Sequence, residues 1–206
     1  MANYILVHGG DRDGSIWSST ASLLKLAGHQ VICPSMKSVK HASLDENIAE
    51  ILEVAQSFQE FILIGHSYAA MVITGVADKI SEKISHLIFV DSVIPKNGQS
   101  LYGMLEELGV NYQDFGLTPD RACLAPLYFD QKKLNEINKT YIRALNSEFL
   151  IALNPIYKNI LANKEKDHWS VFCLDASHGC MLTHSEELAV IFSGVQIINS
   201  HQPSGI

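Results

Sequence analysis

The segment 62–69 reads Ile-Leu-Ile-Gly-His-Ser-Tyr-Ala and places a serine on a turn between a strand and a helix. The apolar run at 61–64 is typical of a fully buried strand, and apolar residues continue at 71–76 as in a buried helix. In this context a serine is presented as a nucleophile, and the crowded turn requires small residues two positions before and after it. Gly65 meets that requirement, and Ala69 meets it with one additional methyl group. We therefore predict Ser67 as the nucleophile; the alternative is a glycine-serine turn with a structural role alone.

The remainder of the chain alternates strand-like and helix-like patterns. The patterns predict strands at 4–7, 30–33, 61–64, 86–90, 141–145 and 171–174. They predict helices at 17–27, from a capping box at Ser43 and Glu46 to about 58, after the serine turn, and from a second capping box at Thr183 and Glu186 to 191. Strands separated by helices indicate a mostly parallel sheet covered on both faces. We expect an α/β fold in a single domain over residues 1–206.

Residues 96–138 do not follow this alternation. They have mixed helical and loop character, and they are rich in aromatic and aliphatic side chains such as Tyr102, Tyr112 and Phe115. Long loops in compact domains are disproportionately functional. The segment therefore predicts a small lid over an active site; the alternative is packing against an edge of the sheet.

Composition excludes several classes of protein. The chain has 206 residues, of which 47% are hydrophobic and 18% charged, with a net charge of −7. An acidic chain argues against a nucleic-acid partner, which requires a basic face, and no apolar run reaches the roughly 20 residues that span a membrane. A strand-like pattern begins at residue 4 without a secretory leader before it. We expect a cytoplasmic protein with free thiols, since there is no C-x-x-C spacing among Cys33, Cys123, Cys173 and Cys180.

A serine nucleophile requires a general base, and the chain offers nine histidines. His178 follows the last predicted strand and precedes the last predicted helix, and open α/β sheets place their sites in such loops. His184 is the second candidate. His8 and His66 flank the expected active-site turns, and His66 is expected to point away from the chemistry because it adjoins the nucleophile. The remaining histidines are read as satisfied or exposed: His29, His41, His86, His168 and His201. His178 is thus the predicted base.

An oxyanion hole needs two backbone N–H groups. One is predicted from Tyr68, the residue after the nucleophile, and the other from the loop after the first strand. That loop contains Gly9 and Gly10, whose small size lets the backbone approach closely, and we predict Gly10 as the second donor. No metal cluster is predicted.

With these features the chain resembles the α/β-hydrolase superfamily, and within it the small esterases grouped with plant methyl esterases and hydroxynitrile lyases. The resemblance rests on the motifs Val-His-Gly-Gly at 7–10, Gly-His-Ser-Tyr-Ala at 65–69, Phe-Val-Asp-Ser-Val-Ile-Pro at 89–95, and His178 followed by Met-Leu-Thr at 181–183. It implies an α/β-hydrolase fold, a Ser–acid–His triad, no cofactor, and a lid over a small-ester pocket. The lyases carry a threonine and a lysine where this chain has Gly10 and Gly179, which favours hydrolysis.

The resemblance also implies an aspartate after the penultimate strand, where this chain has Ser147. Glu148 is adjacent, and its longer arm would offset the displacement, so Glu148 is the predicted acid. Some members of the superfamily take the acid from the end of the strand after the nucleophile, which is Asp91 here. A chain without a functional acid is the third alternative.

Together these residues predict a serine esterase that cleaves small carboxylic esters through an acyl-enzyme intermediate. The alternative is a ligand-binding protein on a hydrolase scaffold with weak or absent turnover. Thioesterase, lactonase and acyltransferase activities stay open because they share the same acyl-enzyme chemistry. The expected partner is a small-molecule ester, without a nucleic acid or a membrane, and the sequence leaves a homodimer open.

Overall fold

The fold was analysed in a computed structural model, which describes residues 1–199 and the side chains of residues 1–195. His201 lies outside the described residues. The described chain forms a six-stranded sheet with the order β2-β1-β3-β4-β5-β6, and every neighbouring pair of strands is parallel. The strands are β1 (Asn3–Val7), β2 (Gln30–Ile32), β3 (Phe61–His66), β4 (Ile84–Val90), β5 (Lys139–Ala144) and β6 (Trp169–Leu174).

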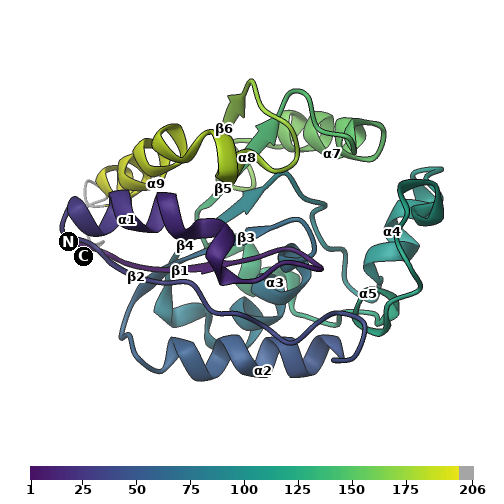
Figure 1. Cartoon of the computed structure of the whole chain (residues 1–206), viewed down its shortest axis with the longest axis horizontal. Coiled ribbons are helices and arrows are strands. Elements are labelled where there is room, and N and C mark those ends of the chain that lie inside the picture. Colours follow the sequence, from purple (N-terminus) through teal and green to yellow (C-terminus); the bar gives the residue numbers. More distant parts are fainter. Residues whose placement is uncertain (200–206) are drawn as a thin grey trace.

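Helices cover both faces of this sheet (Figure 1). The longer helices are α1 (Ser18–Leu26), α2 (Leu44–Ala55), α3 (Ala69–Ile80), α7 (Leu150–Ala162) and α9 (Ser185–Asn199). The shorter ones are η1 (Gly14–Trp17), η2 (Ser81–Lys83), α4 (Leu101–Glu107), η3 (Tyr112–Phe115), α5 (Arg121–Leu124), α6 (Gln131–Glu136) and α8 (Cys180–Thr183). The predicted mostly parallel sheet with flanking helices is confirmed.

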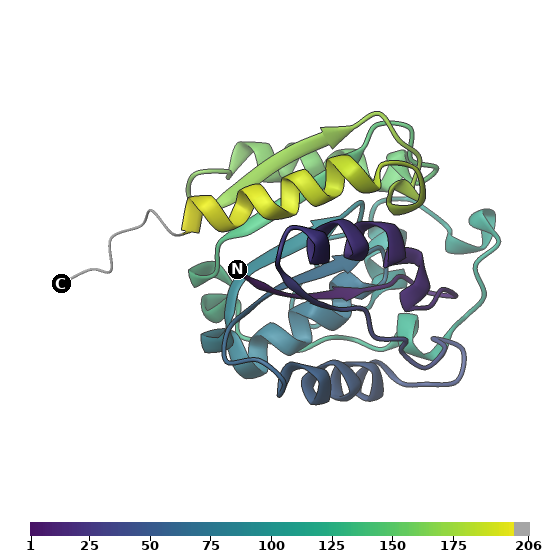
Figure 2. The same cartoon turned by 60° about the vertical axis from the view of Figure 1, so that its left-hand side comes forward.

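Alternate side chains of the strands enter two different hydrophobic clusters, because successive residues of a strand point to opposite faces. On one face the strands pack against α2, α3 and α7; on the other they pack against α1, α8 and α9. In β1, for example, Ile5 belongs to the first cluster and Leu6 to the second. Figure 2 shows α9 and α1 side by side over the second face. Burial on both faces explains why the central strands read as continuous apolar runs.

The two predicted capping boxes have different outcomes. Ser43 caps α2 as expected, with its side chain accepting from the Glu46 N–H and the Glu46 carboxylate accepting from the Ser43 N–H. The second capping box is wrong, because Thr183 is the last residue of α8 and its hydroxyl contacts Nδ1 of His184. α9 then begins at Ser185. Thr183 thus ends the short helix α8 instead of capping α9.

The 96–138 segment leaves the sheet after β4 and returns to it at β5. It contains α4, η3, α5 and α6, and its backbone pairs once with itself in an isolated antiparallel bridge between Gln99 and Leu127. Figure 1 shows α4 and α5 on the side of the molecule toward which β1 runs. The carboxyl ends of the parallel strands face this side, where open α/β sheets place their sites.

Among residues 1–199, no helix combines the length and the apolar character needed to cross a membrane.

Candidate active site

Ser67 lies at the sharp turn between β3 and α3. Its φ of 55° is in the left-handed region, which residues other than glycine rarely adopt. Its N–H donates to the carbonyl of Val90 at 3.2 Å, which ties the turn to the end of the neighbouring strand β4. Gly65 has no space for a side chain, because a Cβ there would lie 3.0 Å from the Ala69 carbonyl oxygen and from the Ile73 side chain. The turn thus has the strained geometry that presents a serine at the edge of the sheet.

The glycines after β1 lie against this turn. A Cβ on Gly9 would lie 2.9 Å from Nδ1 of His66 and 3.1 Å from Cβ of Ser67, so only glycine fits without displacing them. A Cβ on Gly10 would lie 3.8 Å from Cβ of Tyr68. The structure therefore brings together the two backbones predicted to form an oxyanion hole. Tyr68 is also the N-cap of α3, where backbone N–H groups are left without partners in the helix.

Asp91 and His178 form the close polar contact of the site. Nδ1 of His178 lies 2.7 Å from Oδ2 of Asp91, whose side chain is fully buried, while the His178 side chain is 20% exposed. The other carboxylate oxygen of Asp91 accepts from the Ala144 N–H at 3.1 Å, and its own N–H donates to the Ile142 carbonyl at 2.8 Å. A carboxylate that accepts from Nδ1–H leaves Nε2 of the imidazole free to act as a base.

The expectation that Glu148 contacts this imidazole is wrong. The Glu148 side chain is exposed, and its carboxylate accepts from the backbone N–H of His178 at 3.1 Å rather than from the ring. Hydrogen bonds from its own backbone N–H and from that of His178 lower the pKa of Glu148. The ring position is taken by Asp91, which directly follows β4, has a left-handed φ of 41°, and lies with Oδ2 2.7 Å from Nδ1 of the histidine.

His66, the residue before Ser67 at the end of β3, supports His178. Its Nε2 lies 2.9 Å from the His178 carbonyl, and because a carbonyl only accepts, Nε2 must carry the proton. The two rings lie 4.4 Å apart between centroids. Burial is the largest cause that lowers the pKa of His66 well below its usual value, followed by the proximity of His178. His66 is therefore a neutral hydrogen-bond donor that holds the histidine loop.

Other titratable groups near the site do not compete with the serine. Burial raises the pKa of Cys180 to about 12, with the charge of Asp91 as a further cause, so this thiol stays protonated at neutral pH. His8 is fixed by two contacts: its Nδ1 lies 2.7 Å from the Gly9 carbonyl, and its Nε2 accepts from the Met36 N–H at 2.9 Å. Within the described part of the chain, no group of three or more histidine, cysteine or acidic side chains is placed to hold a metal ion.

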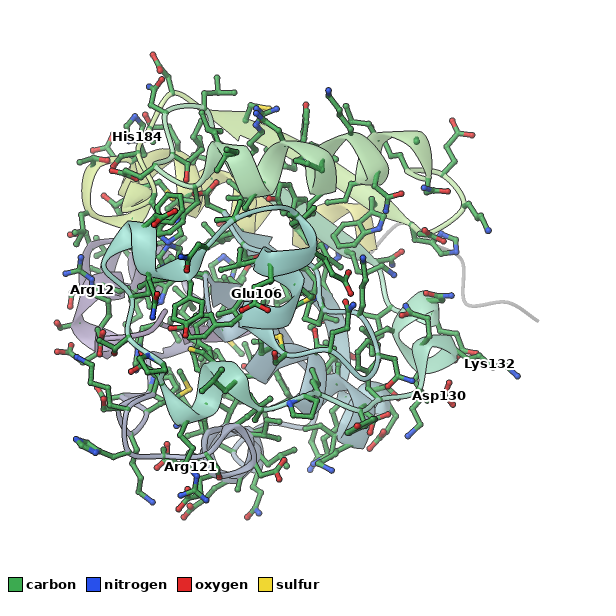
Figure 3. The ribbon with its side chains drawn as sticks, turned by 90° about the vertical axis from the view of Figure 1, so that its right-hand side faces the viewer. Arg12, Glu106, Arg121, Asp130, Lys132 and His184 are labelled. Atoms are coloured by element: carbon green, nitrogen blue, oxygen red, sulfur yellow. The ribbon has the colours of Figure 1, made fainter. Side chains whose placement is uncertain are left out.

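Aromatic side chains connect the 96–138 segment to the histidine. Tyr102 of α4 and Tyr112 of η3 stack with their centroids 3.9 Å apart. Phe115, at the end of η3, stacks on Phe149 at 4.9 Å, and Phe149 in turn packs on His178 at 4.6 Å with the rings inclined by 64°. Figure 3 looks onto this side of the molecule and shows α4, marked by Glu106, in front of the sheet.

Several contacts of the site were missed in the sequence. His66 was expected to point away from the chemistry, whereas it holds the backbone of His178. The Tyr68 hydroxyl donates to Oδ1 of Asn47 at 2.9 Å, which fixes the turn at Ser67 to α2. Phe149 gave no signal, since a phenylalanine beside a predicted strand end is typical of core packing. His184, the second candidate base, contacts Thr183 instead of the Asp91 carboxylate.

Comparison with known proteins supports the same reading. The sequence model of the alpha/beta hydrolase family matches residues 4–143. A carbendazim-hydrolysing esterase of Nocardioides sp. (strain SG-4G) is 39% identical over 115 residues, which cover 51% of this chain and 48% of that protein. Methylesterase 8 of Arabidopsis thaliana is 28% identical over 116 residues, or 51% of this chain and 43% of that protein. The chain thus spans about half the length of these curated relatives.

Solved structures of similar fold match over almost the whole chain. An extracellular α/β-hydrolase from a Paenibacillus species superposes with a TM-score of 0.71 at 20% identity, over 95% of this chain and 99% of that one. A pyrethroid hydrolase from Sphingobium faniae superposes with a TM-score of 0.75 at 18% identity, over 98% and 99%. At these identities the likeness shows the fold. The resemblance to α/β-hydrolases and to the methyl esterase group is confirmed.

Proposed function

Because the chain belongs to the alpha/beta hydrolase family, we propose that it is a serine hydrolase that cleaves small carboxylic esters through an acyl-enzyme intermediate. The observation that carries the proposal is the buried carboxylate of Asp91 on Nδ1 of His178, together with a serine in a left-handed turn after β3, the strand that pairs with β4. Those three groups supply a nucleophile, a base and an orienting acid, which is what acyl transfer requires.

In the proposed mechanism, Ser67 Oγ attacks the acyl carbon while Nε2 of His178 takes its proton. Asp91 keeps the proton of the imidazole on Nδ1 and stabilises the imidazolium that forms. The backbone N–H groups of Gly10 and Tyr68 stabilise the oxyanion, at the positive end of the α3 dipole. His178 then gives this proton to the departing alcohol. In deacylation it takes a proton from the water that attacks the acyl carbon and passes it to Ser67 Oγ as the acid leaves, so both residues return to their starting forms. No cofactor takes part.

We further propose that the 96–138 segment acts as the lid. Its α4 lies in front of the carboxyl ends of the strands, and its Phe115 reaches the aromatic ring that packs on His178. A covering segment with aromatic side chains suits a small apolar acyl or alcohol group. The relatives named as methylesterases support methyl esters as the first substrates to assay.

We also propose that the protein is cytoplasmic and that residues 1–206 form a single domain. Its four cysteines, which are unpaired in the structure, would stay reduced there. A ligand-binding protein without turnover stays the alternative, and the contact of Asp91 with His178 favours turnover.

A fluorophosphonate probe tests the proposal directly, because it reacts with activated serines. We expect one stoichiometric adduct, located on Ser67 by mass spectrometry, together with hydrolysis of p-nitrophenyl acetate. Ser67→Ala should lose both the adduct and the hydrolysis while keeping the wild-type circular dichroism. A well-folded wild-type protein that forms no adduct would overturn the proposal and favour a binding protein.

A further inference from the structure

The loop that follows β5 is fastened to the loop that carries His178. β5 and β6 are paired in parallel up to Ala144 and Leu174, so the loops that follow them leave the sheet side by side. The pairing continues beyond the strands, where the Asn146 N–H donates to the Ala176 carbonyl at 3.0 Å. The Asn146 side-chain amide also donates to Oδ1 of Asp175 at 2.7 Å. The two loops therefore form one connected unit.

Two adjacent residues of the first loop contact His178 itself. The carboxylate of Glu148 accepts from the His178 backbone N–H at 3.1 Å. The ring of Phe149 packs on the imidazole, with centroids 4.6 Å apart and an inclination of 64°. One contact fixes the backbone of the histidine, and the other limits the rotation of its ring.

Phe149 is itself held from the 96–138 segment. Phe115 of η3 stacks on it with centroids 4.9 Å apart and an inclination of 29°. Ser147 orders the loop beneath it, since its hydroxyl accepts from the Phe149 N–H at 3.2 Å. The aromatic contacts run from Phe115 through Phe149 to His178.

We propose that Glu148 and Phe149 are positioning residues for His178, and that Phe115 couples the 96–138 segment to the histidine through Phe149. This inference rests on the proposed function, since it assigns His178 as the base. In this chain the loop after β5 places the histidine, while the acid on its ring comes from β4. The contacts matter because a displacement of about 1 Å in a reacting group can lower a rate by about a hundredfold.

The test compares Phe149→Ala with Phe149→Tyr, and Glu148→Ala with Glu148→Gln. The first member of each pair removes the contact, and the second keeps a ring or an acceptor oxygen. We expect each alanine variant to lower kcat for p-nitrophenyl acetate by about tenfold to a hundredfold, with a smaller change in KM. The rate of fluorophosphonate labelling should fall in parallel, and the conservative variants should restore most of both rates.

Phe58→Ala provides the matched control. Phe58 is also a packed phenylalanine, but it contacts Phe61 at the amino end of β3, at the other end of that strand from Ser67. The Phe58→Ala variant should have a lower melting temperature than the wild type and an unchanged kcat. In a double-mutant cycle, Phe115→Ala should lower kcat in the wild type and have a much smaller effect in the Phe149→Ala background.

A readout independent of turnover separates this inference from the proposed function. The Nδ1 proton of His178 should give a downfield NMR signal that is absent in Asp91→Asn. It should broaden or shift in Phe149→Ala, and the His178 amide should exchange faster in Glu148→Ala. Wild-type NMR signals and rates in both alanine variants would overturn the inference, even if Ser67 is labelled. If the probe does not label the wild-type protein but the variants still change these NMR signals, only the proposed esterase activity would be overturned.

Discussion

Ser67 and Asp91 leave the sheet directly from β3 and β4, whereas His178 lies four residues beyond the end of β6. The first two residues adopt left-handed backbone conformations, with φ of 55° and 41°. Such conformations cost about 1–3 kcal/mol each and persist only where the surroundings fix them. His178 is partly exposed and depends on side-chain contacts instead. The sheet therefore fixes the proposed nucleophile and acid, while neighbouring loops place the proposed base.

The largest expected effect separates the two carboxylates near His178. Asp91→Asn should lower kcat by about 10⁴-fold, because an amide at the ring stabilises the wrong tautomer of the imidazole. Glu148→Gln should cost less than about 1 kcal/mol, or about fivefold, since its amide oxygen still accepts from the His178 N–H. Steady-state kinetics of both variants on one ester measures the ratio. Equal losses would mean that the strand-borne acid has no special role.

The next prediction tests how closely the strand-borne side of the site is packed. Gly9→Ala places a methyl group 2.9 Å from Nδ1 of His66 and 3.1 Å from Cβ of Ser67. Overpacking of this kind typically costs about 1–3 kcal/mol. Urea unfolding should reveal the loss, and labelling of Ser67 should slow, because the serine must shift. Gly194→Ala is the control for an added methyl group without overpacking, since a Cβ there meets nothing within 4 Å and its φ, like that of Gly9, is not left-handed. Fast labelling in Gly9→Ala would contradict the crowded turn.

The smallest effect concerns pH and His66, which links the two sides of the site. Its pKa is lowered in the folded protein, so below pH 6.5 the unfolded chain binds more protons than the folded one. The free energy of unfolding should therefore fall by about 1.4 kcal/mol per pH unit below this value, and this group should contribute no pH dependence above it. Burial also lowers the pKa of His8, which adds a dependence of the same sign.

The difference between the wild type and His66→Gln isolates the contribution of His66, since His8 is common to both. Urea unfolding at pH 7.5, 6.0 and 5.0 should give a shallower dependence in the variant. The glutamine amide still offers a donor to the His178 carbonyl, so folding should be retained. Parallel dependences in the two proteins would mean that His66 is protonated in the folded state.

Much of the fold followed from local patterns in the sequence. All six strands were predicted within a few residues, because buried parallel strands read as apolar runs between helical segments. The Ser43 capping box was predicted because both of its partners lie within one helical turn. α7 was not predicted, since the helix contains Pro155 and has no side-chain cap at its N-terminus. The capping box predicted at Thr183 was wrong because Thr183, although it matches the motif, is the last residue of the short helix α8.

Local patterns in the amino-acid sequence predict the α/β architecture, the turn at Ser67, and the loops that carry Gly10 and His178. Each of these depends on residues close together in the chain: strand periodicity, a small residue before a turn, or a loop after a strand. Which carboxylate contacts the imidazole depends on the folded sheet, because Asp91 and His178 are 87 residues apart in sequence. Strand order places β4 and β6 on either side of β5, and so brings the residues that follow them to the same end of the sheet. No local pattern encodes this contact, so the family resemblance favoured Glu148, next to the expected position of the acid, and the folded sheet favours Asp91.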